Sequence, residues 1–272
     1  MKKKIRIVLI AVLALVFLVS MAMLLTQRRE QREVADIYNR AQQIAAGESV
    51  KPEPAGPENP AQSEQPSEDN RQPEPSAKPS DTPGSVLHSI DTAALQAINR
   101  HVIGWISIPG TGLSYPLVQG SDNEYYLDHA WDGTPTPAGS IFMEAGCAAD
   151  FTDFNTIVYG HRMTYDAMFA FLKYYKSQAY WQEHPLVYIR DGEQTRCYRI
   201  FAAYEAPIRS PVYWLKVTDE NHKQTVIDFA LEQSVIDTGI IPQPAQRILT
   251  LSTCTGDGHE TRWVVQAVEV LP

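Results

Sequence analysis

The strongest constraint on the fold of this chain is an uncharged, mostly apolar run of 19 residues, Ile7 to Leu25, that directly follows a basic cluster at residues 2–6. As a helix rising about 1.5 Å per residue, this run is about 28 Å long, close to the roughly 30 Å of a bilayer's hydrocarbon core. A lone segment in lipid satisfies its own backbone only as a helix. Basic residues before the run predict a cytoplasmic N-terminus and an exported body. We expect residues 1–6 to be a cytoplasmic tail and residues 7–25 a transmembrane signal-anchor.

A cleaved signal peptide is the alternative interpretation of the same segment. Ser20 and Ala22 have the small-x-small spacing of a cleavage site. The apolar run is longer than the core of a usual signal peptide, and this length favours the uncleaved anchor.

Two segments follow the anchor before any globular pattern begins. Residues 26–46 are expected to form a juxtamembrane helix. Residues 47–84 are rich in Pro, Glu, Ser and Gln and contain no aromatic residue, so they cannot bury enough apolar surface to offset the entropy of ordering. We expect a disordered linker in which polyproline II conformation, at about 3.1 Å per residue, gives a stalk with a reach on the order of 100 Å.

The folded body, residues 85–272, alternates short β-type runs with turn residues. A helix is expected after Asp91, and two further helices over residues 165–175 and 219–236. Eight short strands with few helices predict a mostly β fold, a largely antiparallel barrel or sandwich. The eight runs are GWISIPG, SYPLVQG, GSIFMEA, NTIVYGH, PLVYIRDG, CYRIFAAYEA, RILTLSTC and RWVVQAVEV.

Charge separates the body from the segments before it. Residues 1–84 carry 11 Lys/Arg and 11 Asp/Glu, so the net charge of −9 lies entirely on residues 85–272. An acidic domain without a Lys/Arg cluster argues against nucleic acid as a partner.

The three cysteines are an odd number in an exported domain. Cys147 and Cys197 are candidates for a disulfide, or for two buried free thiols, and the sequence does not decide between them. Either way Cys254 is left over, which calls for a reason.

Cys254 ends a strand-like run, and Arg262 begins the next. Ile248, Thr250, Ser252 and Cys254 alternate onto the more polar face of their run, where a thiol is less expected as core filler. If the two runs pair as a hairpin, Cys254 and Arg262 are cross-strand neighbours about 5 Å apart between Cα atoms. A guanidinium there can stabilise a thiolate, or the oxyanion formed when that thiolate attacks a carbonyl.

A nucleophilic cysteine needs an imidazole nearby, and His161 is the best candidate among the seven histidines. It follows the β run NTIVYG, and Gly160 before it would permit a sharp bend. His259, in the loop after Cys254, is close in sequence but lies on a solvated segment. The spacing matches no common zinc site, so no metal and no cofactor is expected.

Several motifs in order resemble the sortases, the membrane-anchored cysteine transpeptidases of Gram-positive cell surfaces. TLSTC with Arg262 downstream and YGHRM upstream carry the resemblance. The runs GWISIPGTGLSYPLVQGSDNEYYLDH, GSIFME, HPLVYI and RWVVQAVEV extend it to the class B sortases over nearly all of residues 90–270. Arg162 stands where an Asn is common, and the loop between Cys254 and Arg262 is short.

The resemblance implies a closed eight-stranded β-barrel with an N-terminal helix and inserted helices, residues 85–272 being the catalytic domain. Cys254 is then the nucleophile, His161 the acid/base and Arg262 the oxyanion or carbonyl donor. Residues expected to line the groove for the sorting signal are Tyr159, Leu127, Thr250 and Ser252. The implied reaction cleaves an LPxTG- or NPxTN-like sorting signal through a thioester and transfers the exported protein to an amine of peptidoglycan or its lipid-linked precursor, outside a single-pass membrane anchor.

Two alternatives remain at this point. A pilin-polymerising sortase would use a lysine of a pilin as acceptor, and a non-catalytic surface-binding domain on a stalk would need no reactive Cys254. A papain-type peptidase is disfavoured because there the cysteine precedes the histidine, whereas His161 precedes Cys254 here.

Overall fold

The computed structural model describes residues 2–48, 90–192, 194–254 and 260–270, and side chains within these ranges except at residues 2–11 and at Cys254. Its eight strands close into one barrel in the order β1-β2-β3-β4-β7-β8-β6-β5. The strands are β1 (Val102–Ser107), β2 (Ser114–Val118), β3 (Ile141–Met143), β4 (Asn155–His161), β5 (Leu186–Asp191), β6 (Gln194–Pro207), β7 (Ile248–Cys254) and β8 (Thr261–Val270). All eight predicted β runs are strands, and the expected closed barrel is confirmed.

Two strand pairs in the barrel are parallel, β2 with β3 and β4 with β7, while the other pairs are antiparallel. A parallel pair needs a long crossover. For β4 and β7 that crossover contains η3 (Phe169–Lys176), α3 (Gln178–Glu183), β5, β6, η4 (Pro211–Tyr213) and α4 (Glu220–Gln233). The barrel is therefore largely antiparallel, as expected, and the parallel pair of β4 and β7 decides which strand ends meet.

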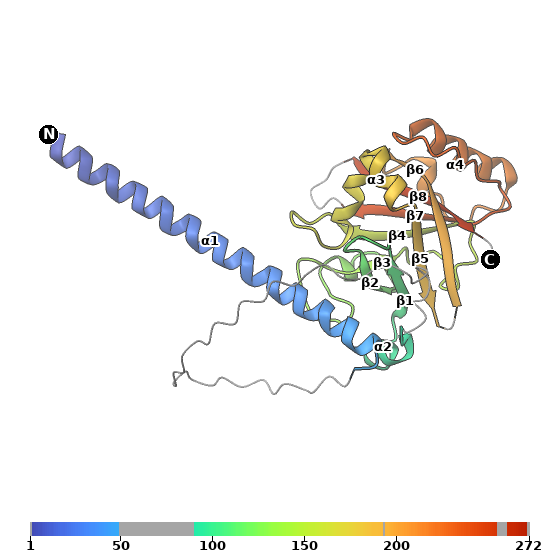
Figure 1. The fold of residues 1–272 in the computed structure, drawn as a ribbon, viewed down its shortest axis with the longest axis horizontal. Helices are drawn as coiled ribbons and strands as arrows, with labels where there is room; N and C mark the ends of the chain where they lie inside the picture. The colour runs from blue at the N-terminus through green and yellow to red at the C-terminus, as the bar shows by residue number, and fades with distance from the viewer. Residues whose placement is uncertain (1, 49–89, 193, 255–259, 271–272) are drawn as a thin grey trace, which may run out of the picture.

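The helices of the body differ in how well the sequence predicted them. Helix α2 (Thr92–Ile98) starts directly after Asp91, as expected, and the Asp91 side chain caps it by accepting a hydrogen bond from the backbone N–H of Ala94. Helix α4 covers the outside of the barrel, with Val226, Ile227 and Ala230 fully buried (Figure 1).

The helix expected over residues 165–175 is wrong in type and extent. The segment forms the 3₁₀ helix η3, which begins only at Phe169. Met168 before it has φ 50°, a left-handed conformation that an α-helix cannot contain. No pattern in the sequence indicated α3 or the short turns η2 (Tyr125–Leu127) and η4.

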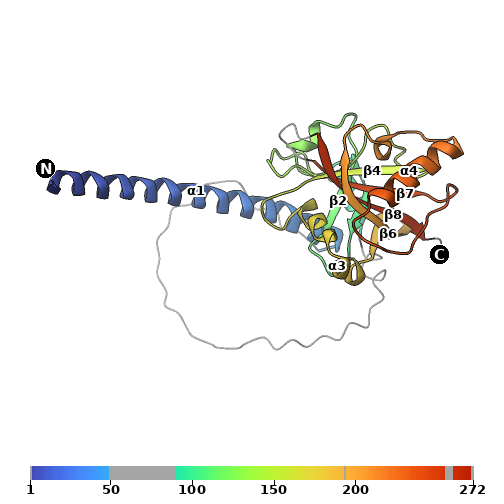
Figure 2. The same cartoon turned by 90° about the horizontal axis from the view of Figure 1, so that it is seen from above.

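Helix α1 (Lys2–Ala45) is continuous from the apolar run into the juxtamembrane segment. It is long and apolar enough to cross a membrane, and from Val12 to Leu25 its large apolar side chains are exposed. Figure 2 shows its N-terminal part projecting away from the barrel as a rod while its C-terminal end lies against the barrel.

The C-terminal end of α1 is hydrogen-bonded to the start of the barrel domain. The backbone N–H of Asp91 donates a hydrogen bond to the carbonyl oxygen of Ala45, 2.8 Å away. The residues on either side of the predicted linker, Ala45 and Asp91, therefore lie side by side. The predicted linker lies almost entirely outside the described residues, as does the loop that contains His259.

Candidate active site

The backbone brings His161 and Cys254 together. Strands β4 and β7 run parallel, in a register from Asn155 opposite Ile248 to His161 opposite Cys254. Because parallel strands end at the same edge, both residues lie at one rim of the barrel.

Arg262 comes to the same rim from the other side of β7. Strands β7 and β8 are antiparallel, with Ser252 opposite Val264, and the same register two residues further on puts Cys254 opposite Arg262. Reciprocal hydrogen bonds between the Thr253 hydroxyl and the backbone of Trp263, at 3.1 and 3.4 Å, hold the strands together at the intervening position. Cys254 thus lies on the strand between those of His161 and Arg262. Their catalytic roles stay predictions.

The imidazole of His161 is held by a backbone carbonyl. Its Nε2 lies 2.6 Å from the carbonyl oxygen of Leu127, at the end of η2. A carbonyl oxygen only accepts, so Nε2 carries the proton. Arg262 is partly buried, and its Nη1 donates to the carbonyl oxygen of Thr261, 3.1 Å away. Leu127, expected to line a substrate groove, therefore contacts His161 through its main chain.

Gly160 does not bend the chain before His161, as the sequence suggested, but allows close packing. Strand β4 runs through it to His161. A Cβ at position 160 would lie 2.8 Å from Cγ of Phe169, much closer than ordinary contact. The missing side chain makes room for this buried ring beside His161.

Thr250 and Ser252 are both fully buried. The Thr250 hydroxyl donates to Oδ1 of Asn155 at 2.6 Å and accepts from Nε2 of Gln266 at 2.9 Å. The Ser252 hydroxyl lies 2.9 Å from the hydroxyl of Tyr213 in η4. Both side chains fix β7 to its neighbours, and a role in contacting a peptide stays a prediction for them.

Tyr159 is oriented by a residue that the sequence did not single out. The Tyr159 hydroxyl donates to Oε2 of Glu144, 3.0 Å away, and Asn123 Nδ2 donates to Oε1 at 2.6 Å. The Glu144 side chain is buried at the end of β3, in the run GSIFMEA. In the sequence, Glu144 could have been singled out because it is a lone acidic residue directly after an apolar strand.

The other two cysteines are free thiols. Burial raises the pKa of Cys147 to about 11 and also raises the pKa of Cys197. The disulfide alternative is therefore not what the structure contains, and both thiols are poor nucleophiles at neutral pH.

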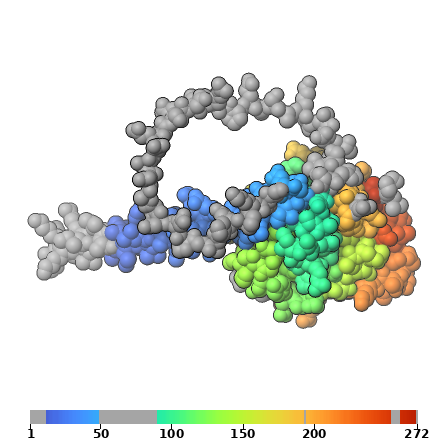
Figure 3. All heavy atoms as spheres, turned by 90° about the horizontal axis from the view of Figure 1, so that it is seen from below, coloured from blue at the N-terminus to red at the C-terminus, as the bar shows by residue number. Residues whose placement is uncertain are grey.

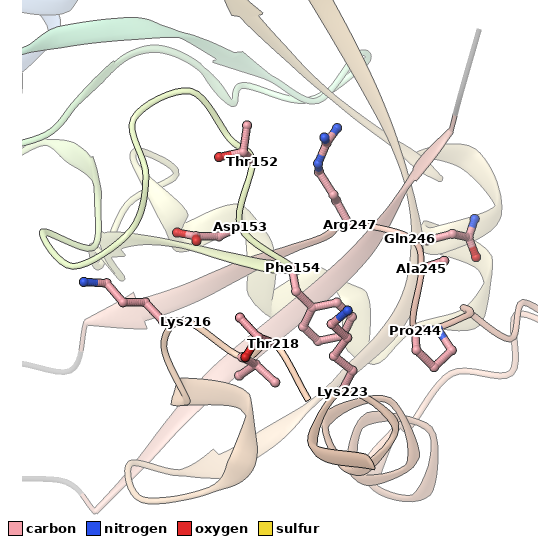
Figure 4. Close-up of a pocket in the computed structure, with 11 residues that line it drawn as sticks. Thr152, Asp153, Phe154, Lys216, Thr218, Lys223, Pro244, Ala245, Gln246 and Arg247 are labelled. Carbon is pink, nitrogen blue, oxygen red and sulfur yellow. The ribbon is translucent and has the colours of Figure 1, made fainter. Parts of the chain in front are cut away.

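A cavity of about 570 Å³ lies at the other end of the barrel (Figure 4). Phe154 and Arg247, which line it, directly precede β4 and β7. Two of its three cations are matched by carboxylates: Lys223 pairs with Glu220 at 2.7 Å, and Arg247 with Glu269 at 3.1 Å. It is separate from the rim that carries Cys254.

Comparison with known proteins agrees with this geometry. A family model described as a sortase domain matches residues 106–270. The chain is 33% identical to sortase B of Listeria monocytogenes over 174 residues, 63% of this chain and 71% of that protein. Its fold matches a Staphylococcus aureus sortase B–substrate complex with a TM-score of 0.63 and 29% identity, over 66% of this chain and 84% of that chain. It also matches a sortase B complexed with triglycine, with a TM-score of 0.63 and 29% identity, over 65% and 84% of the two chains.

The family match covers most of the barrel and contains all three residues of the rim, while the relative and the solved structures are sortase B proteins. The chain therefore belongs to the sortase family of cysteine transpeptidases, as a class B sortase.

Proposed function

We propose that this enzyme cleaves an LPxTG- or NPxTN-like sorting signal with Cys254 as nucleophile, His161 as acid/base and Arg262 as carbonyl donor. The observation that carries the proposal is the register that places His161 and Arg262 on the two strands flanking that of Cys254. A cysteine as nucleophile, an imidazole as acid/base and a guanidinium as oxyanion donor, on adjacent strands at one rim, can together carry out acyl transfer.

In the first half-reaction the Cys254 thiolate attacks the carbonyl carbon of the scissile peptide bond. The carbonyl electrons move to oxygen, where Arg262 stabilises the negative charge. The C–N bond then breaks, its electron pair leaves with nitrogen, and His161 gives that nitrogen a proton. A thioester between Cys254 and the new carboxyl end of the exported protein remains.

In the second half-reaction an amine attacks the thioester carbonyl. His161 accepts a proton from the amine, the C–S bond breaks, and the Cys254 thiolate is restored. A thioester reacts more readily with amines than with water, so transfer competes with hydrolysis. The proposed acceptor is an amine of peptidoglycan or its lipid-linked precursor. The sortase B complexed with triglycine supports this class, because that peptide offers a free amino group.

The proposed location of the enzyme follows from the apolar run in α1. We place the apolar run in the cell membrane as a single span, the basic N-terminus in the cytoplasm and the barrel outside. There the enzyme meets sorting signals of exported proteins.

A fluorogenic peptide panel containing LPxTG- and NPxTN-like sequences tests the proposal with the full chain in detergent micelles. Cleavage is expected to disappear in Cys254→Ala and to persist in Cys197→Ala, a matched control on a half-buried thiol away from the rim. Added triglycine should yield a ligated product detectable by mass spectrometry. Equal cleavage by Cys254→Ala and its parent would end the proposal.

A further inference from the structure

The C-terminal part of α1 is packed into the barrel domain as one of its own elements. Val34, Tyr38, Ala41 and Ala45 recur every three or four residues and are all buried, so they form one stripe along the helix. Figure 3 shows this end of α1 against the segment that begins at α2. The sequence had assigned these residues to a juxtamembrane helix outside the catalytic domain.

Tyr38 makes the most specific contact of this stripe. Its hydroxyl donates to the carbonyl oxygen of Gly139, 2.6 Å away, in a buried hydrogen bond. Its ring packs edge-on against Tyr115, with 5.1 Å between ring centroids. Burial raises the pKa of Tyr38, so the phenol stays a neutral donor at physiological pH.

Gly139 lies directly against Leu127. Its φ is +56°, and a Cβ there would lie 2.5 Å from the carbonyl oxygen of Leu127, so the close approach requires glycine. Two backbone hydrogen bonds flank this contact: Ser140 N–H to Tyr126 at 2.9 Å, and Thr136 N–H to Asp128 at 2.8 Å. The segment that Tyr38 holds therefore fixes the main chain of Leu127 from both sides.

The Leu127 carbonyl oxygen is the acceptor for His161, at 2.6 Å. A second contact fixes α1 to the same region, because the indole N–H of Trp131 donates to the carbonyl oxygen of Ile37 at 3.3 Å. A continuous set of contacts thus runs from the membrane helix to the imidazole.

We propose that residues 34–45 of α1 belong to the catalytic unit and that Tyr38 is a positioning residue for His161. It acts through Gly139 and the carbonyl of Leu127. The membrane anchor then helps to set the orientation of the acid/base group. This inference rests on the proposed role of His161.

The test uses the full chain in detergent micelles, with turnover of a cleaved peptide and ¹⁵N-histidine spectra as readouts. Tyr38→Phe removes only the hydroxyl and keeps the ring. We expect kcat to fall about 3- to 10-fold with KM within about twofold, since one hydrogen bond in the supporting contacts is lost. The His161 signals should move, while those of exposed His222 should not.

A second pair of variants tests the docking of α1 on the barrel, separately from the hydroxyl of Tyr38. Ala41→Glu puts a charge at a fully buried position and should undock the segment, with a larger loss of kcat and the same displaced His161 signals. Gln43→Glu, on the exposed face of the same helix, is the matched control and should behave as the parent does. A melting curve for each variant establishes that the barrel is folded at the assay temperature.

Unchanged kcat and unchanged His161 signals in both Tyr38→Phe and Ala41→Glu would overturn the inference. If the parent shows no cleavage that depends on Cys254, the proposed function fails, and the His161 spectra alone decide whether α1 positions the imidazole.

Discussion

The Nε2 proton of His161 is directed at the main-chain carbonyl of Leu127, 2.6 Å away. In the proposed mechanism, Nδ1 is therefore the nitrogen left to exchange a proton with a bound peptide. In other enzymes with a nucleophile and a base, a third group orients the base in this way, commonly a carboxylate. Here the neutral carbonyl of Leu127 orients the His161 ring. The position of this carbonyl depends on how the main chain near η2 is packed.

Selective labelling of one cysteine is the first prediction. Burial raises the pKa of Cys147 to about 11 and raises that of Cys197. A raised pKa means less thiolate at a given pH, so at pH 7 a thiol with a pKa of about 11 is ionised in only about 1 molecule in 10⁴. A thiol-reactive vinyl sulfone should label Cys254 alone at neutral pH, measured by peptide mass spectrometry. Labelling of the other two thiols should appear only as pH rises towards their pKa values.

Cys254→Ala serves as the control, and labelling of this variant at neutral pH should be close to zero. Faster modification of Cys197 than of Cys254 in the folded parent would contradict the assignment of the nucleophile.

Arg262 is expected to act by geometry as well as by charge. Arg262→Ala should lower kcat about 10²- to 10³-fold, the usual cost of removing one oxyanion donor. Arg262→Lys keeps the charge but loses the planar fork, and we expect only partial recovery. Steady-state cleavage of a sorting-signal peptide measures both, with Arg199→Lys, an exposed position on β6, as the control. Full activity of Arg262→Ala would remove Arg262 from the mechanism.

The strands and the pairing of the Cys254 strand with the Arg262 strand were predictable because their causes are local. Alternating apolar residues bounded by turn residues specify each strand. The short loop between the runs of Cys254 and Arg262 specifies an antiparallel pair, which the register of β7 and β8 matches.

Other features depend on parts of the chain that are far apart in sequence. Nothing within the run of His161 indicates that β4 pairs in parallel with β7, because that pairing is set by the long crossover. The acceptor for His161 is a main-chain group of Leu127, and every residue has such a group. The docking of α1 was missed because Tyr38 and Ala41 follow an apolar span, and the proline-rich segment after them suggested separation.

Removal of the Thr250 hydroxyl should destabilise the barrel. Thr250→Val is almost isosteric, but it leaves Oδ1 of Asn155 and Nε2 of Gln266 without their partner at a fully buried site. Each buried unsatisfied group costs about 1–3 kcal/mol, so we expect a loss of about 3 kcal/mol. For a domain of this size Tm should fall by about 6–12 °C in a calorimetric scan.

The control for this variant is Thr225→Val on α4, where the hydroxyl is exposed and bonds within its own helix. This change should alter the free energy of unfolding by less than about 0.5 kcal/mol. Equal stability of Thr250→Val and its parent would show that the buried hydrogen bonds of Asn155 and Gln266 add nothing to the barrel.

The docking of α1 predicts that the chain between Ala45 and Asp91 can be cut without releasing the barrel from a membrane. The full chain, with a protease site inserted within residues 49–89, is placed in lipid vesicles and cleaved. If that segment were the connection to the membrane, cutting would send the barrel into the supernatant. The buried stripe of α1 and the hydrogen bond of Tyr38 to Gly139 should instead keep it with the sedimented vesicles, even at high salt, because apolar packing is not screened. Ala41→Glu should release the cut barrel, whereas Gln43→Glu should not. Release of the barrel without a substitution in α1 would show that residues 49–89 are its connection to the membrane. It would also remove the basis for coupling between the anchor and His161.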